Sequence, residues 1–171
     1  MSDHPSVAAM AESYAQKAVE QARDLHAQLD FTENSLLDLE TILDRVAQNL
    51  PLPGSPAPAG ATSSTGAPSS GSATSAGSAS ASASSDVLTE ICKTWGCYLG
   101  EVVRRRFGGE WSIETYPGKQ FATLTLTVQG SKIFPSMKIH RRLTQTSADA
   151  DNVWAFFKMV KQRLEAAPRV H

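Results

Sequence analysis

The first fifty residues carry their apolar side chains at the spacing of two consecutive helices. In residues 5–29, apolar positions recur every three or four residues along a narrow stripe rich in alanine. Leucines at heptad spacing follow in residues 32–50, and Thr32 is of a residue type that often caps a helix N-terminus. Small side chains on one helix facing leucines on another are typical of a closely packed antiparallel pair. The pattern predicts a helical hairpin over residues 1–50.

No hydrophobic pattern continues through residues 51–85. Apart from Leu52, this segment contains only proline, glycine, serine, alanine and threonine. Such a composition cannot bury enough apolar surface to offset the entropy that is lost when the chain is ordered. We therefore predict a disordered linker, which divides the chain into the hairpin and a C-terminal part over residues 86–171.

The C-terminal part changes from helical to strand periodicity at two glycines. Residues 86–107 place an apolar face at helical spacing, and Gly108 and Gly109 end it because glycine adopts the left-handed conformation without steric cost. Trp111 then opens a stretch in which apolar and polar residues alternate, and residues 121–129 alternate apolar residues with threonines. This alternation predicts a half-buried antiparallel β-hairpin.

Residues 132–143, with the sequence KIFPSMKIHRRL, predict a third strand after the hairpin. Pro135 indicates an edge position or a bulge, since proline cannot donate a hydrogen bond to a neighbouring strand. A last amphipathic helix, capped by Ser147 or Asp149, ends near Leu164. We therefore expect an α+β fold with a three-stranded antiparallel sheet flanked by two helices over one face, plus the N-terminal hairpin.

Charge is divided unevenly between the two ends of the chain. Residues 1–50 hold three Lys and Arg against nine Asp and Glu, and residues 86–171 hold thirteen against eight, within a formal net charge of −1. Two helices alone seldom form a stable domain. We expect the acidic hairpin to pack on another surface, either the basic part of its own chain or a second copy.

The C-terminal part contains three short motifs: a Leu-Gly pair in its first predicted helix, Gly-x-x-Trp at the end of that helix, and Phe-Pro before a basic predicted strand. The residues concerned are Leu99, Gly100, Gly108, Gly109, Trp111, Phe134, Pro135, Lys138, Arg141 and Arg142. This order resembles a bacterial family of small α+β domains of unknown function. The resemblance covers about residues 86–166, and it implies no activity and no catalytic residue.

No residue pattern in the sequence indicates a catalytic, metal or cofactor site. The four histidines are scattered, and the acidic cluster at residues 149–152 lies where a helix should begin. Cys92 and Cys97 point about 140° apart on a helix, so we expect no disulfide. The N-terminus lacks the features of a secretory signal, and no apolar run reaches the length of about eighteen residues that a membrane span needs. We expect a cytoplasmic protein without cofactor or membrane association, and the sequence leaves the question of enzymatic activity open.

The basic residues of the third predicted strand are the candidate partner-binding site. A period of two places Lys138, His140 and Arg142 on one face, as a patch for phosphate, nucleic acid or an acidic protein surface. In the alternative interpretation, charges on an edge strand only discourage sheets from associating. Two functional hypotheses follow. One is a non-catalytic protein-interaction module that binds a protein partner or itself, and the other is a nucleic-acid or other polyanion-binding module that uses the basic face.

Three consecutive arginines end the first helix of the C-terminal part. The first two point to solvent on a helix with about 100° per residue, and Arg105 follows Glu101 by four residues, the favourable order for an exposed ion pair. Arg106 falls in the apolar arc, so we expect its head group to reach a carboxylate such as Glu110 or Glu114. The candidate structural residues are Arg106, Gly108, Gly109, Trp111, Phe134 and Pro135.

Overall fold

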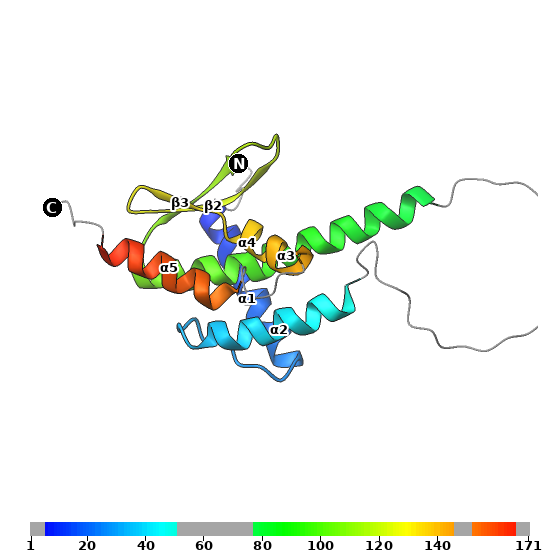
Figure 1. The fold of residues 1–171 in the computed structure, drawn as a ribbon, viewed down its shortest axis with the longest axis horizontal. Helices are drawn as coiled ribbons and strands as arrows, with labels where there is room; N and C mark the ends of the chain where they lie inside the picture. Colours follow the sequence, from blue (N-terminus) through cyan, green and yellow to red (C-terminus); the bar gives the residue numbers. More distant parts are fainter. Residues whose placement is uncertain (1–5, 51–76, 146–151, 167–171) are drawn as a thin grey trace, which may run out of the picture.

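The fold is α+β, as predicted, with five helices and one antiparallel sheet in the described part of the chain (Figure 1). The computed structural model describes residues 6–50, 77–145 and 152–166, without the side chains of residues 77–84. The elements in chain order are α1 (Val7–Asp24), α2 (Ser35–Asn49), α3 (Gly77–Phe107), β1 (Glu110–Thr115), β2 (Ala122–Val128), β3 (Ser131–Ile133), α4 (Pro135–Thr144) and α5 (Val153–Ala166).

Two predicted segments lie partly outside the described residues. The linker expected over residues 51–85 lies outside them up to residue 76, and α3 begins at Gly77. The caps expected for the last helix, Ser147 and Asp149, are also outside. Within the described part, α5 is capped by Asn152, whose side-chain oxygen accepts the backbone N–H of Ala155 at 2.9 Å.

The sheet confirms the antiparallel β-hairpin that the alternation of apolar and polar residues predicts. Its strand order is β1-β2-β3, and Trp111 of β1 lies opposite Leu126 of β2, with both side chains buried. Gly108 and Gly109 end α3 with φ angles of 76° and 125°, which residues with a Cβ rarely adopt. A Cβ at Gly109 would also lie 2.7 Å from the carbonyl oxygen of Thr127. The two glycines thus stop the helix and let the chain turn closely against β2.

The predicted third strand is wrong beyond its first residues. The strand β3 ends at Ile133, and the helix α4 follows. Phe134 occupies the N-cap position and Pro135 the first turn, where the missing N–H of proline leaves no helix hydrogen bond unmade. Pro135, Ile139 and Leu143 are buried at a spacing of four residues, which fits one side of a helix. A helix therefore stands where an edge strand was expected.

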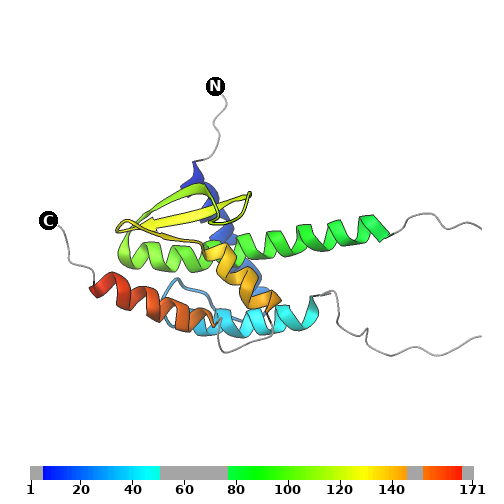
Figure 2. The same ribbon diagram turned by 45° about the horizontal axis from the view of Figure 1, so that its top comes forward.

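Helix α3 is the centre of the fold. Figures 1 and 2 show the sheet on one side of α3 and α4, with α2 and α5 on the other side. Helix α1 lies against α3 and also contacts β1. Helix α5 was expected over the sheet, but it packs on α2 and α4. The largest fully buried side chains of α3 are Tyr98, Leu99, Glu101, Val102 and Val103.

The N-terminal helices pack on the C-terminal part of the same chain. The alanine stripe of α1 faces α3, whereas we expected it to face the leucines of α2. The apolar side of α2 packs against α4 and α5. Ion pairs cross the contact, with Lys17 2.6 Å from Glu90 and Lys161 2.9 Å from Glu33. Docking therefore occurs within one chain in this structure.

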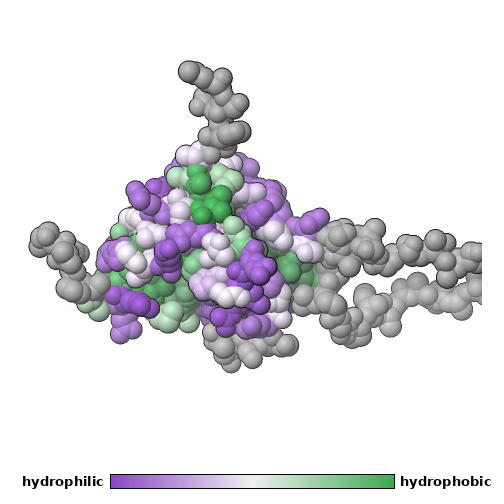
Figure 3. Space-filling view, turned by 90° about the horizontal axis from the view of Figure 1, so that it is seen from above, coloured by the Kyte–Doolittle hydropathy of each residue, from purple (hydrophilic) through white to green (hydrophobic). Residues whose placement is uncertain are grey.

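Few large apolar side chains remain on the surface of the described residues. Those that are exposed are Leu37, Val87, Ile113, Phe121 and Met159. Figure 3 shows one face that is mainly hydrophilic, with a compact apolar patch near its upper middle. Three of the exposed side chains, Ile113, Phe121 and Met159, line pockets that are described below.

Candidate functional site

The basic residues of α4 do not form the common face that the strand prediction implied. Successive residues of an α-helix are rotated by about 100° around its axis, so side chains two positions apart point in different directions. Lys138 lines one pocket, His140 lines a second pocket, and Arg142 is buried. The expectation of one open face with three cations is therefore wrong, because the segment is helical.

Arg142 holds three helices together inside the protein. Its side chain is 7 % exposed and forms ion pairs with Glu40 and Asp44 of α2. Glu40 also accepts the backbone N–H of Val153, at the start of α5, at 2.8 Å. Burial alone would lower the pKa of Arg142, but the hydrogen bonds and charges of the two carboxylates raise it above its ordinary value. Arg142 is thus a charged structural residue.

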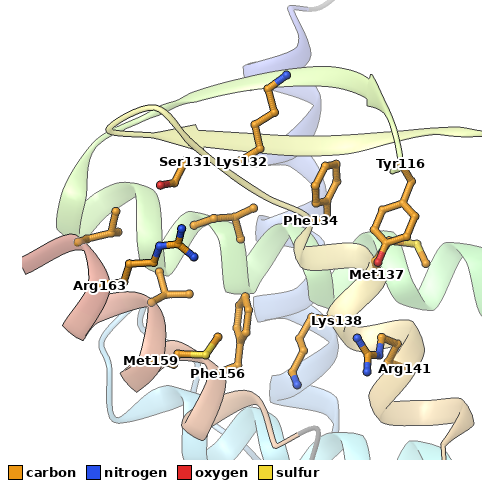
Figure 4. Close-up of a pocket in the computed structure, with 13 residues that line it drawn as sticks. Tyr116, Ser131, Lys132, Phe134, Met137, Lys138, Arg141, Phe156, Met159 and Arg163 are labelled. Carbon is orange, nitrogen blue, oxygen red and sulfur yellow. The ribbon is translucent and has the colours of Figure 1, made fainter. Parts of the chain in front are cut away.

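A pocket of about 260 Å³ lies where β3, α4 and α5 meet (Figure 4). Its apolar floor consists of Ile133, Phe134, Met137, Phe156, Met159, Val160 and Leu164. Its cations are Lys132, Lys138, Arg141 and Arg163, and Tyr116 and Ser131 complete the lining. No Asp or Glu is among the described residues that line it. We call this site the cationic pocket.

The basic side chains of the cationic pocket do not all point into it. In Figure 4, Arg163 extends from α5 toward the pocket, while Lys132 points away from it. Lys132 forms an ion pair with Glu114 of β1. The ammonium group of Lys138 lies 5.4 Å from the ring centre of Phe156, in a cation–π contact. An anionic group at the rim would therefore lie near cations from both α4 and α5.

The carboxylate of Glu101, which we expected in an exposed ion pair, is buried and interacts with two residues of the arginine run. Glu101 has no exposed surface and accepts hydrogen bonds from Trp111 Nε1 and Arg104 Nε, each at 2.7 Å. Arg105 lies 3.5 Å from Glu101, which confirms the predicted pair. Burial raises the pKa of Glu101, but the hydrogen bonds from Arg104 and Trp111 outweigh burial and leave the pKa below its ordinary value. Arg105 is exposed, as predicted, whereas Arg104 is half-buried, and both head groups reach back to the buried carboxylate.

Arg106 has a different partner from those predicted. Its side chain is 54 % exposed, and its Nε lies 3.3 Å from a carboxylate oxygen of Glu33 in the loop before α2. Neither Glu110 nor Glu114 pairs with it in the described part of the chain. Glu33 is distant in sequence and is brought near by the packing of α2, so helical spacing alone could not identify it.

Residues that carry the family resemblance meet around Trp111. A Cβ at Gly100 would lie 2.2 Å from the ring of Trp111 and 3.1 Å from Pro135, so only glycine fits between them. Phe134 packs edge-on against Tyr116, with ring centres 5.1 Å apart. Gly100, Trp111, Phe134 and Pro135 therefore have packing roles in this fold.

The described residues offer little for metal binding or thiol chemistry. They contain no cluster of three or more His, Cys, Asp or Glu side chains that could hold a metal ion. Burial raises the pKa of both Cys92 and Cys97 to about 12, so these thiols stay protonated near neutral pH. The cationic pocket combines apolar surface with positive charge, which suits recognition of an anionic, partly apolar group.

No family model, no curated protein and no solved structure matches the chain. The family resemblance of the C-terminal part therefore stays a prediction. Within the stretches that the structure describes, no helix is both long enough and apolar enough to cross a membrane.

Proposed function

We propose that the chain is a non-catalytic protein-interaction module whose cationic pocket binds an acidic segment of a partner protein. The observation that carries the proposal is the pocket itself, in which Arg163 extends from α5 toward an apolar floor and no carboxylate is among the described lining residues. A partner segment would insert an apolar side chain and place an Asp or Glu beside the rim. The segment belongs to another protein or to a second copy of this chain.

The size and composition of the pocket favour a protein segment as the occupant. Its volume of about 260 Å³ lies below the range of about 300 to 1,000 Å³ that is common for small-molecule sites. Arginine, methionine and aromatic residues are enriched at protein interfaces. Methionine adapts to different partners because its side chain is unbranched and polarisable, and Met159 is 60 % exposed over the pocket.

The polyanion hypothesis has lost the observation on which it depended. Its basic face required Lys138, His140 and Arg142 side by side, and Arg142 instead pairs with carboxylates of α2. A nucleic-acid site would also need cations that follow the nucleic-acid backbone, with aromatic side chains on which the bases stack.

The two buried free cysteines are in keeping with the reducing cytoplasm, which we propose as the compartment.

The test begins with selection of peptides from a displayed library of random dodecapeptides on the full chain. We expect enriched sequences to pair Asp or Glu with a large apolar residue. The enriched peptide is then synthesised and its Kd measured by fluorescence anisotropy. Met159→Asp should weaken binding about tenfold or more, because it removes apolar contact at the floor.

Charge reversal at the rim gives the second readout. Arg163→Glu should weaken the peptide several-fold, with a larger effect at low salt. The matched control is Arg23→Glu, which makes the same charge change at an exposed arginine at the end of α1, away from the pocket lining. Equal effects of the two reversals, enrichment of basic peptides, or binding of nucleic acid that survives Arg163→Glu would contradict the proposal.

A further inference from the structure

A second pocket lies on another side of α4 from the cationic pocket. Its volume is about 730 Å³, and its walls come from α1, α3, α4, the sheet and the turn between β1 and β2. The two pockets share one lining residue, Met137. The size is within the range of sites for small molecules, and it is nearly three times that of the cationic pocket.

The apolar wall of this second pocket is an uncovered part of the inner face of the sheet. Trp111 and Ile113 lie on the same face of β1, since side chains alternate along a strand. Trp111 packs under α3 and is 8 % exposed, whereas Ile113 is 53 % exposed although its neighbour across the sheet, Leu124, is buried. Phe121, 44 % exposed, extends the same wall. The sheet therefore continues past the helices and leaves apolar surface open to the pocket.

Basic side chains from three different elements line the second pocket. Lys93 comes from α3, Lys119 from the β1–β2 turn and His140 from α4. No Asp or Glu is among its described lining residues. The carboxylate of Glu90 accepts from the Tyr14 hydroxyl at 3.4 Å and pairs with Lys17 at 2.6 Å, and the charge of Lys93 contributes less than Lys17 to lowering the pKa of Glu90. The charge of the lining therefore favours an anion.

We propose that the second pocket binds a single-chain amphiphilic anion, with a carboxylate or phosphate head. The apolar chain lies along Ile113, Leu124 and Met137, where it covers the open part of the sheet. The head group lies toward Lys93 and Lys119, which donate charge-assisted hydrogen bonds to its oxygens. The proposal does not depend on the function of the cationic pocket, because different residues carry it.

The primary test uses sodium dodecanoate, below its micelle concentration, with the full delipidated chain in a calorimetric titration. We expect one molecule bound per chain. Ile113→Asp should weaken binding at least about tenfold, because it places a charge on the apolar wall. Val87→Asp is the matched control, since Val87 is 54 % exposed on α3 and does not line the pocket. Ala122→Trp, which fills the pocket from β2, should give the same loss.

A second measurement locates the ligand. With methionine methyl groups labelled with ¹³C, dodecanoate should shift the signal of Met10, which lines only the second pocket, and leave that of Met159 unchanged. Dodecyltrimethylammonium, which has the same chain and a cationic head, should bind at least about tenfold more weakly. No binding of dodecanoate, equal binding of the cation, or a shift at Met159 in place of Met10 would overturn the proposal.

A parallel arm distinguishes a free amphiphile from a membrane lipid as the source of the ligand. The chain is sedimented with vesicles of phosphatidylglycerol and, as a control, of phosphatidylcholine. Binding of dodecanoate without sedimentation supports a free ligand. Sedimentation with the anionic vesicles alone, abolished by Ile113→Asp and not by Val87→Asp, supports a ligand drawn from a lipid surface. Sedimentation that is equal for both vesicle types or unaffected by Ile113→Asp, with no dodecanoate bound, overturns the proposal.

Discussion

The change Glu101→Gln should destabilise the fold by about 2 kcal/mol. The carboxylate has no exposed surface and accepts hydrogen bonds from Trp111 Nε1 and Arg104 Nε at 2.7 Å. A hydrogen bond to a charged group contributes about 1.5 to 3 kcal/mol. Glutamine keeps the size of the side chain and an acceptor at Oε1, which takes both of these hydrogen bonds, but it loses the charge and places an N–H donor at Oε2, where Arg104 Nη2 donates at 3.1 Å. Because the side chain of Arg104 is 30 % exposed, its guanidinium can turn to water, which limits the loss.

The matched control is Glu12→Gln. Glu12 also pairs with Arg104, at 3.1 Å, but its side chain is 55 % exposed. Exposed ion pairs contribute little, so this change should cost under about 0.5 kcal/mol. Urea unfolding followed by tryptophan fluorescence should show the difference as a midpoint lower by roughly 1 M for Glu101→Gln only.

The effect of Glu101→Gln should also depend on pH. The pKa of Glu101 in the folded protein is below its ordinary value. A carboxylate of this kind stabilises the fold fully above its unfolded pKa of about 4.3, and the contribution is lost as the pH falls through the lower folded value. The gap between the wild type and Glu101→Gln should thus be largest at pH 7 and shrink below about pH 4. Equal effects of the two substitutions at pH 7, or a gap that grows in acid, would refute the reasoning.

Three further changes test the packing. Gly100→Ala should lower the free energy of unfolding by about 1 to 3 kcal/mol, because the new Cβ would lie 2.2 Å from the ring of Trp111. Thermal unfolding should show the loss of stability, and near-ultraviolet circular dichroism should show the altered environment of the tryptophan. Arg142→Ala should cost about 3 to 5 kcal/mol in urea unfolding, since it leaves a mostly buried carboxylate of α2 without its cation; a loss under about 1 kcal/mol would contradict the assigned role. Cys92 and Cys97, with pKa values of about 12, should react with a thiol reagent at pH 7 only after urea is added, and rapid reaction of the native chain would show that they are not buried.

The β-hairpin and the end of α3 could be predicted from the sequence because neighbouring residues along the chain determine them. Gly108 and Gly109 adopt positive φ angles that stop the helix, and the alternation after Trp111 matches the strands. Residues 135–143 were predicted wrongly as a strand, because their apolar pattern fits both the strand period of two and the helical period of about 3.6. Alternate positions suggested a strand with Pro135 at an edge, whereas the spacing of four from Pro135 to Leu143 is the helical signal that the structure follows.

The binding residues depend on packing that the sequence does not reveal. Lys138 and Arg163 stand 25 positions apart, and only the crossing of α4 and α5 brings them to one pocket. The pairing of Glu101 with Arg105 was predicted from their spacing, but the burial of Glu101 was not, because the surrounding fold causes it. Arg142 belonged to the predicted basic face and proved to be internal, because α2 supplies its carboxylates.

The methionine methyl spectrum of the full chain, recorded during titration with the peptide selected from the library, tests binding at the cationic pocket most directly. The chain has four methionines, of which Met159 lines only the cationic pocket and Met10 only the second pocket. The proposed function predicts a saturable shift of Met159 with Met10 unchanged, and it predicts that Arg163→Glu, but not Arg23→Glu, moves the titration to higher peptide concentration. A shift confined to Met10, or a response equal in both variants, would contradict binding at the cationic pocket.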